Sequence, residues 1–332
     1  MQYVVFGNTG MLVSRFTLGG MTLGTRFEPD QATQVVDEAI DHGVNFIDTA
    51  DSYRDSEECI GRALTPEKRD KVFLATKVFR TFCRNGKVGR NSRVNIINSL
   101  ERSLKVLKTD YVDLYQLHHP DEQTPVEETL STLDQMVKQG KIRYVGVSNH
   151  YAWQMALMLG ESKANHWESI VSFQASYSIL DRQIEMESLP FCTKLNIAIM
   201  CYGPLCGGIL TGKYQGLKEI PEDSRAAGNR RTRDYLETAD VRKIVERLEE
   251  IARDNDLKLN QLAILWLLGK SHATTVILGG SKSEHFTQIY EIADRTLPEC
   301  VVKEIDDLSS CRIYCPFANQ PFRMGPGLRK TF

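Results

Sequence analysis

The 332-residue chain lacks the features that mark several classes of protein. Its 41 Lys and Arg residues are balanced by 43 Asp and Glu residues, and a net charge of −2 provides no field that would attract nucleic acid or an acidic membrane surface. No apolar run approaches the length of about 18 residues that a membrane-spanning helix needs. The N-terminal residues mix polar and apolar side chains, unlike a signal peptide, so we expect a cytoplasmic protein.

Two further absences concern cofactors. The eight cysteines are scattered singly, with no CxxC pair and no zinc-type spacing, so we expect no structural metal and reduced thiols. No G-x-G-x-x-G motif opens a helix, because the glycines at 7 and 10 and those at 19, 20 and 24 have other spacings. This argues against a dinucleotide-binding domain of the Rossmann type, so a bound dinucleotide would need another kind of site.

What the chain does contain is a repeated alternation. Eight short apolar runs, rich in β-branched residues, lie at 16–20, 45–48, 72–77, 111–118, 142–148, 169–174, 197–202 and 274–280. Helical apolar stripes separate them, for example Val94, Ile97, Leu100, Leu104 and Leu107. Strands that alternate with helices and are apolar on both faces predict a parallel sheet covered on both sides.

The positions of the polar residues favour a closed barrel over an open sheet. Each run ends at its carboxyl end in polar residues or glycine: Asp48, Lys77, His118, Ser148 and Asn149, Gln174, Tyr202 and Gly279. A (β/α)8 barrel gathers its chemistry at that face from many strands, whereas a doubly wound sheet uses one switch point. We therefore predict a (β/α)8 TIM barrel.

Three segments lie outside the repeat. Residues 3–14 predict a β-hairpin that covers the bottom of the barrel. The polar stretch 212–240 is too long for a simple connection, and loops of this length are usually functional or mobile. A last helix near 299–309 precedes an irregular tail. No linker or low-complexity segment divides the chain, so we expect residues 1–332 to form a single domain.

Seven motifs, in order, resemble the aldo-keto reductase superfamily, and the resemblance covers roughly residues 1–300. They are FIDTADSY, ATK, QLHHPD, GVSN, FQ, CYGPLCGGILTGKY and ILGGS. Each motif alone is weak, but together they are specific. The resemblance implies a (β/α)8 barrel of the long-loop type that reduces an aldehyde or ketone to an alcohol with a nicotinamide cofactor.

By position in these motifs, the resemblance implies four catalytic residues. Tyr53 corresponds to the proton donor and Lys77 to the cation that helps it, while Asp48 pairs with Lys77 and His118 orients the carbonyl oxygen. A free tyrosine, with a pKa near 10, is a slow acid at neutral pH, so a neighbouring cation should help it.

Each of these residues also has a purely structural reading. Asp48 would cap the next helix, Lys77 would be a solvated lysine at a strand end, and Tyr53 would pack at a helix start. His118 is followed by His119, and one of the two must face away from the site.

The resemblance also implies the residues that hold the cofactor. They are Gly20, Met21, Ser148, Asn149, Gln174, Tyr202, Gly203, Pro204, Leu205, Gly207, Thr211, Lys213, Arg225, Gly279, Ser281, His285 and Gln288. Within this set, Ser148, Asn149 and Gln174 would hold the nicotinamide carboxamide and Tyr202 would stack on its ring. A helix N-cap is the alternative for Ser148 and Asn149.

The chain departs from the family pattern at two positions. His285 stands where an arginine or glutamine commonly contacts the 2′-phosphate, and Ile289 stands where asparagine is usual near the adenine. Lys282 and a protonated His285 would still hold the phosphate, so NADPH is favoured over NADH.

Two expectations concern the substrate and the possible protein partner of the site. The loops 20–28, 79–91 and 203–240 carry the apolar residues Met21, Phe27, Phe79 and Phe82 and the basic residues Arg80, Arg84, Lys87, Arg90, Arg230, Arg231 and Arg233. They suggest an anionic or carbohydrate-derived carbonyl substrate, unless the charges are solvated or hold the cofactor. Potassium-channel β subunits resemble the chain as well, so a cofactor-binding interaction subunit is the alternative function. The absence of an N-terminal extension before the hairpin favours the enzyme.

Overall fold

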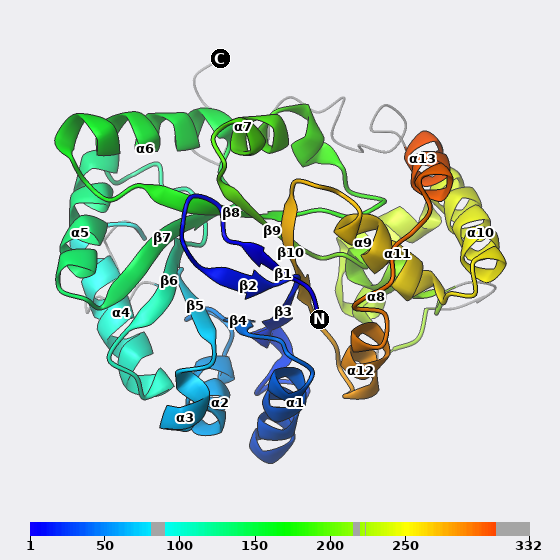
Figure 1. Cartoon of the computed structure of the whole chain (residues 1–332), viewed down its shortest axis with the longest axis horizontal. Helices are drawn as coiled ribbons and strands as arrows, with labels where there is room; N and C mark the ends of the chain where they lie inside the picture. Colours follow the sequence, from blue (N-terminus) through cyan, green and yellow to red (C-terminus); the bar gives the residue numbers. More distant parts are fainter. Residues whose placement is uncertain (81–89, 215–219, 223, 310–332) are drawn as a thin grey trace.

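The computed structural model describes residues 1–80, 90–214, 220–222 and 224–309 (Figure 1). Eight parallel strands close into a barrel in the order β10-β3-β4-β5-β6-β7-β8-β9. Their bounds are β3 Phe16–Gly19, β4 Phe46–Asp48, β5 Phe73–Val78, β6 Val112–Leu117, β7 Ile142–Ser148, β8 Ile170–Ser176, β9 Ala198–Tyr202 and β10 Ala273–Leu278. The prediction of a (β/α)8 barrel is confirmed.

Each of the eight predicted runs is one strand of the barrel, with ends that differ by at most two residues. Strands β5 and β6 are buried at every position. This explains why the runs are apolar without alternation: one face of each strand points into the barrel and the other contacts the helices.

The helices surround the barrel (Figure 1). Their bounds are α1 Pro29–Asp41, α2 Ser56–Ala63, α3 Pro66–Arg69, α4 Arg93–Leu107, α5 Val126–Lys138, α6 Ala152–Asn165, α7 Ser188–Lys194, α8 Arg225–Gly228, α9 Arg230–Glu237, α10 Ala239–Asp254, α11 Leu259–Leu268, α12 Glu284–Tyr290 and α13 Glu299–Leu308. Short 3-10 turns are η1 Gly20–Thr22, η2 Gln183–Met186 and η3 Cys206–Thr211. One stripe prediction was wrong in detail: Val94 in the first turn of α4 is 54% exposed, and Ile96 is buried instead.

The predicted hairpin is formed by β1 (Tyr3–Val5) and β2 (Leu12–Ser14), which pair antiparallel. Phe6, in its turn, is fully buried, and its ring centroid lies 5.5 Å from that of Phe46 and 5.3 Å from that of Phe73. Phe46 and Phe73 are the first residues of β4 and β5, so the hairpin closes the amino-terminal end of the barrel, and Figure 1 shows it lying across this end.

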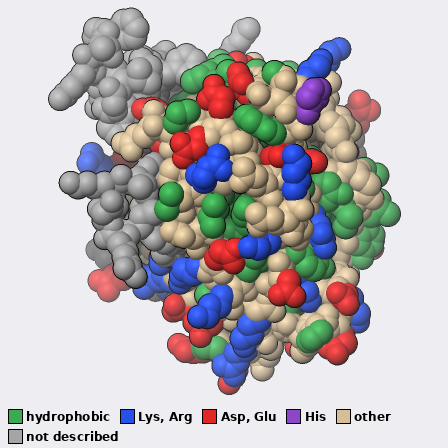
Figure 2. Space-filling model, turned by 90° about the vertical axis from the view of Figure 1, so that its left-hand side faces the viewer, with side chains coloured by type: hydrophobic (Ala, Val, Ile, Leu, Met, Phe, Trp, Pro, Cys, Tyr) green, Lys and Arg blue, Asp and Glu red, His purple; other side chains and the backbone are tan. Residues whose placement is uncertain are grey.

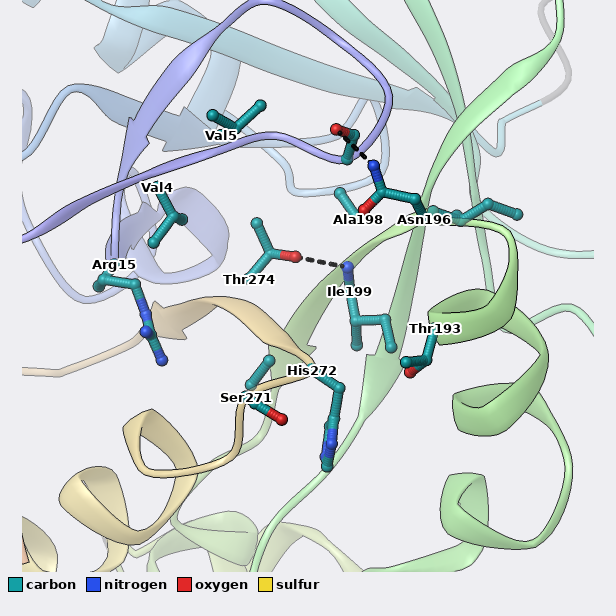
Figure 3. Close-up of a pocket in the computed structure, with 13 residues that line it drawn as sticks. Val4, Val5, Arg15, Thr193, Asn196, Ala198, Ile199, Ser271, His272 and Thr274 are labelled. Atoms are coloured by element: carbon teal, nitrogen blue, oxygen red, sulfur yellow. Dashed lines mark hydrogen bonds between the residues drawn. The ribbon is translucent and has the colours of Figure 1, made fainter.

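A cleft of about 180 Å³ lies between this hairpin and the amino-terminal ends of β9 and β10 (Figure 3). The backbone N–H of Ile199 donates to Thr274 Oγ1 across its wall, at 3.0 Å. Arg15 lines the cleft and donates from Nη2 to the carbonyl of Leu268, the last residue of α11. The C-terminal carbonyls of a helix carry partial negative charge, so this contact stabilises the positive charge of the Arg15 guanidinium.

The segment between β9 and β10 is the long connection that the sequence predicted. It contains η3, two short helices (α8 and α9), the long helix α10 and the fully buried helix α11, which packs on β10. The tail from residue 310 onward and residues 81–89 lie outside the described residues. On the face that carries α4 and α5, acidic and basic side chains are interspersed, including the ion pairs Lys138–Asp134 and Lys141–Glu101 (Figure 2).

Candidate active site

The carboxyl ends of β4 and β5 bring together a buried ion pair. Lys77 Nζ donates to Asp48 Oδ2 at 2.6 Å and to the carbonyl of Thr49 at 2.8 Å, and the two charged side chains are 0% and 3% exposed. Lys77 is therefore not a solvated strand-end lysine. Asp48 does not cap a helix either, because the N-cap of α2 is Asp55.

The charge of Lys77 follows from this pair. Burial by itself lowers the pKa of an ammonium group, but the charge of Asp48, together with Tyr53 and the hydrogen bonds to both, outweighs it. The net effect raises the pKa of Lys77 above its ordinary value. The site thus holds a fixed cation at neutral pH.

Tyr53 reaches this cation from the loop between β4 and α2. Its Oη lies 3.5 Å from Lys77 Nζ and 3.5 Å from His118 Nε2. The ring of Tyr53 also stands edge-on to the imidazole of His118, with centroids 5.6 Å apart. Lys77 and His118 therefore both lie beside the phenol oxygen of Tyr53, and Asp48 is linked to it through Lys77.

His118 and His119 follow β6 with their rings stacked at 5.0 Å, but only His118 faces Tyr53. Burial, together with the charges of Lys77 and His119, lowers the pKa of His118 to about 2. His118 is therefore a neutral imidazole. Its Nδ1 lies 3.5 Å from Ser52 Oγ.

Two glutamines complete the surroundings of Asp48. Gln116 Nε2 and Gln174 Nε2 each donate to Asp48 Oδ1 at 2.9 Å. The resemblance assigned Gln174 to the cofactor, whereas its amide nitrogen contacts Asp48 in this structure. Sequence reasoning missed Gln116. Side chains alternate along a strand, so Gln116 lies on the same face as His118, which follows it by two residues.

The residues expected around the nicotinamide lie at the ends of β7 to β9. Tyr202 Oη donates to Asn149 Oδ1 at 2.7 Å, and Asn149 Nδ2 donates to the carbonyl of His118 and to Ser148 Oγ, both at 3.0 Å. The helix-cap reading of Ser148 and Asn149 was wrong, because Tyr151 is the N-cap of α6.

The glycine-rich segment after β9 turns back on itself through positive φ angles. These are +67° at Gly203, +67° at Gly207 and +94° at Gly208, a region that side chains with a Cβ rarely adopt. The predicted residues Pro204, Leu205, Thr211 and Lys213 belong to this segment, and Gly20 and Met21 lie in η1 after β3. The Arg225 side chain lies outside the described residues.

The turn after β10 carries Gly279 and Ser281 into α12. The backbone N–H of Ser281 donates to His285 Nδ1 at 3.3 Å. Burial lowers the pKa of His285, and the charges of Lys282 and Lys213 lower it further, while the charge of Glu284 opposes them.

Two further positions of interest on α12 are Gln288 and Ile289. Gln288 Oε1 accepts from Lys258 Nζ at 3.4 Å, and its carbonyl accepts from Gln261 Nε2 at 2.9 Å. Ile289 is 2% exposed and packs in the main hydrophobic core.

Sequence comparison relates most of the chain to known proteins. The Aldo/keto reductase family model matches residues 15–310. The chain belongs to this family. It is 32% identical over 323 residues to a protein named uncharacterized oxidoreductase YrpG of Bacillus subtilis (strain 168), covering 93% of this chain and 96% of that protein. Membership supports an oxidoreductase that acts on carbonyl groups with a nicotinamide cofactor.

Two further relatives carry different names. Aldo-keto reductase YhdN of Bacillus subtilis (strain 168) is 31% identical, and the alignment covers 99% of both chains. A probable voltage-gated potassium channel subunit beta of Arabidopsis thaliana is 32% identical, over 89% of this chain and 92% of that protein. The similarity therefore does not separate the two functions considered for this chain.

The described ranges contain neither a cluster of metal ligands nor a helix suited to a membrane. No cluster of three His, Cys, Asp or Glu side chains there has an arrangement that would hold a metal ion. No helix in those ranges is long and apolar enough to cross a membrane.

Proposed function

We propose that the chain acts as a single-domain, NADPH-dependent reductase that converts an aldehyde or ketone to the alcohol, with Tyr53 as the proton donor. The observation that carries the proposal is the phenol oxygen of Tyr53, which has Lys77 Nζ and His118 Nε2 each at 3.5 Å. A cation and a neutral imidazole around one acidic oxygen suit general-acid catalysis at a developing alkoxide.

The donor set at the strand ends fits a nicotinamide cofactor. The hydroxyl of Ser148 and the amides of Asn149 and Gln174 would hold its carboxamide, and Tyr202 offers a ring to stack on. Lys213 and Lys282 lie close enough to depress the pKa of His285, and such a cluster of cations suits the additional phosphate of NADPH. The cofactor, when bound, supplies the hydride.

The protein's own part is to move one proton. Tyr53 donates its phenolic proton to the carbonyl oxygen, and Lys77 stabilises the phenolate that remains. Asp48 holds the lysine in place. Burial keeps His118 neutral, so its Nε2 carries either an N–H or a lone pair. In the tautomer with the N–H on Nε2, His118 would donate to the carbonyl oxygen and orient it beside Tyr53. Positioned general acids of this kind contribute roughly 10²–10⁴-fold to the rate.

We further propose an anionic or carbohydrate-derived substrate, on narrower grounds than the sequence suggested. The guanidinium of Arg90 lies 4.6 Å from the ring centroid of Phe79, which in turn contacts His118. Arg230 instead pairs with Asp234, and Arg233 donates to the carbonyl of Ala227. Phe82, Arg84, Lys87 and the side chain of Arg231 lie outside the described residues. Equal kcat/KM for an aldehyde and its carboxylated analogue would count against this substrate class.

The decisive experiment follows NADPH oxidation with a panel of aldehydes for the wild type and Tyr53→Phe. We expect Tyr53→Phe to lose about 10²–10⁴-fold in kcat while binding NADPH normally. Tyr111→Phe is the matched control, since Tyr111 precedes β6 at the opposite end of the barrel and stacks on Arg69 and Arg143. Retained activity in Tyr53→Phe would refute the assignment of the proton donor.

The similarity to channel β subunits supports a second candidate, a cofactor-binding interaction subunit. The same experiment separates the two. Tight NADPH binding with negligible turnover across the panel, in the wild type as well as in Tyr53→Phe, would favour the interaction subunit.

A further inference from the structure

A second buried carboxylate, Asp51, lies in the loop that carries Tyr53. Its side chain accepts hydrogen bonds from the backbone N–H groups of Phe79 and Arg80, at 3.1–3.2 Å to both carboxylate oxygens. Its own backbone N–H donates to the carbonyl of Lys77 at 3.2 Å. Asp51 thus ties the loop after β4 to the chain that leaves β5, immediately beyond Lys77.

These bonds fix the position of an aromatic side chain. The ring centroid of Phe79 lies 5.4 Å from that of His118 and 5.2 Å from that of His119, edge-on to both. On the far side of Asp51, the carbonyl of Arg80 accepts from Asn95 Nδ2 of α4 at 2.9 Å. The backbone of residues 79 and 80 is therefore held from two sides, and Phe79 forms a wall beside His118.

We propose that Asp51 is a positioning residue for carbonyl reduction: its ionised carboxylate holds the backbone of Phe79 and Arg80 so that Phe79 confines the substrate between His118 and Tyr53. The proposal rests on the proposed function, because it places the substrate carbonyl beside Tyr53. It concerns substrate binding rather than proton transfer, since the carboxylate of Asp51 accepts from the backbone of Phe79 and Arg80.

The surroundings of Asp51 make this contact sensitive to pH. The pKa of Asp51 is raised to about 7: burial is the main cause and the charge of Glu57 from α2 adds to it, while the two backbone bonds and the charge of Arg80 oppose the increase. The buried phenol of Tyr115, on β6, faces the carboxylates of Asp51 and Glu57. Arg102 Nη1 of α4 lies 3.5 Å from Glu57 Oε2. Asp51 therefore gains its proton near neutrality, and a neutral carboxyl is a weaker acceptor for two N–H groups.

Asp51→Asn tests the role of the carboxylate with almost no change in volume. Both N–H groups lie about equally far from both carboxylate oxygens, so the amide NH2 group of asparagine would face N–H donors at close range. We expect KM for the aldehyde to rise about tenfold at pH 8, while kcat changes less than about threefold and NADPH affinity is unchanged. In the wild type KM should rise as the pH falls through about 7, and this dependence should be absent from Asp51→Asn.

The matched control is Asp134→Asn. Asp134 is also buried and also accepts from a backbone N–H, that of Glu168 at 3.1 Å, but it lies on α5. The Asp134→Asn variant should have the same KM, with the same pH dependence, as the wild type. An unchanged KM in Asp51→Asn at pH 8, or an equal rise in Asp134→Asn, would overturn the proposal.

Hydrogen–deuterium exchange supplies a readout that needs no turnover. With peptides that cover residues 78–80, the wild type should show protection at pH 8 that falls as Asp51 gains a proton, and Asp51→Asn should show little protection at either pH. If the aldehyde panel is not reduced but this pattern is found, the hold of Asp51 on the loop stands and the proposed function fails. Equal protection in the two proteins would refute the hold itself.

Discussion

The pair of Asp48 and Lys77 provides the sharpest test of how the site is built. Asp48→Asn removes one negative charge but keeps the size of the side chain and its ability to accept from Gln116 and Gln174. Lys77, which is 0% exposed, then has no anionic partner in the pair. Its remaining acceptors are the carbonyl of Thr49 at 2.8 Å and the phenol oxygen of Tyr53 at 3.5 Å.

The expected loss of stability follows from the burial of this pair. Removing one partner of a buried ion pair typically costs about 3–5 kcal/mol, because the other charge is left without compensation. An unfolding entropy of about 2.1 cal/mol/K per residue corresponds to about 0.7 kcal/mol/K for a chain of 332 residues. We therefore expect Tm to fall by about 4–7 °C.

The pH dependence of this loss has a definite sign. In the variant, burial lowers the pKa of Lys77 without an anion to oppose it. A lysine whose pKa is lower in the folded state destabilises the protein at pH values at which it is charged in both the folded and the unfolded state. Stability should therefore recover as the pH rises toward the ordinary lysine pKa of about 10.4. The difference in Tm from the wild type should therefore be larger at pH 6 than at pH 9.

Calorimetry or thermal denaturation followed by circular dichroism measures these differences. Asp307→Asn is the matched control, because its partner Lys303 and Asp307 itself are 74% and 68% exposed and such pairs contribute about 0–1 kcal/mol. The double variant Asp48→Asn with Lys77→Met removes both charges and should be more stable than Asp48→Asn alone. A Tm for Asp48→Asn within about 1 °C of the wild type at pH 6 would refute the reasoning.

Two other predictions test the electrostatics and the packing. Because the pKa of His118 is lowered to about 2, its imidazole should not titrate between about pH 4 and pH 9, and an NMR titration with a midpoint above about 5 would contradict this. Gly61→Ala should destabilise the protein, since a Cβ there would lie 2.4 Å from the carbonyl oxygen of Val106, whereas Gly160→Ala in α6 meets nothing within 4 Å and should stabilise by about 0.5–1 kcal/mol. Urea denaturation checks both, and equal effects of the two substitutions would contradict the packing argument.

The barrel was predictable because its constraint repeats eight times. Each strand must bury both faces, so its apolar run is continuous, and its first polar residue marks the carboxyl end. The hairpin was predictable from its turn signal, but its packing was not. Nothing in the local sequence indicates that Phe6 meets Phe46 and Phe73, because the three residues are far apart in the chain.

The helices show where periodicity is less reliable. The stripe assigned to α4 began at Val94, which is 54% exposed, whereas Ile96 is buried. Near a helix start the apolar spacing fits more than one face, and the choice depends on the neighbouring helices rather than on the stripe itself. The connection between β9 and β10 similarly contains two short helices, α8 and α9, that its polar composition concealed.

In the candidate site, the pairing of Asp48 with Lys77 was predictable, but the further partners of Asp48 were not. The resemblance named Asp48, Lys77 and Tyr53 but gave no role to Gln116, and it gave Gln174 a role that did not include Asp48. A strand-end residue in a barrel meets side chains from every other strand, and which of them it meets depends on the stagger between strands. That stagger is a property of the closed sheet.

The contacts of Gln174 have a consequence for the proposed relay. Its Nε2 donates to Asp48 Oδ1 at 2.9 Å, and Asp48 Oδ2 accepts from Lys77, which lies 3.5 Å from the phenol of Tyr53. A ligand that accepts from this N–H of Gln174 must therefore compete with one of the bonds that disperse the charge of Asp48. With that bond weakened, the carboxylate interacts more strongly with Lys77. The proton donor would then respond to occupancy of the neighbouring site through a single carboxylate.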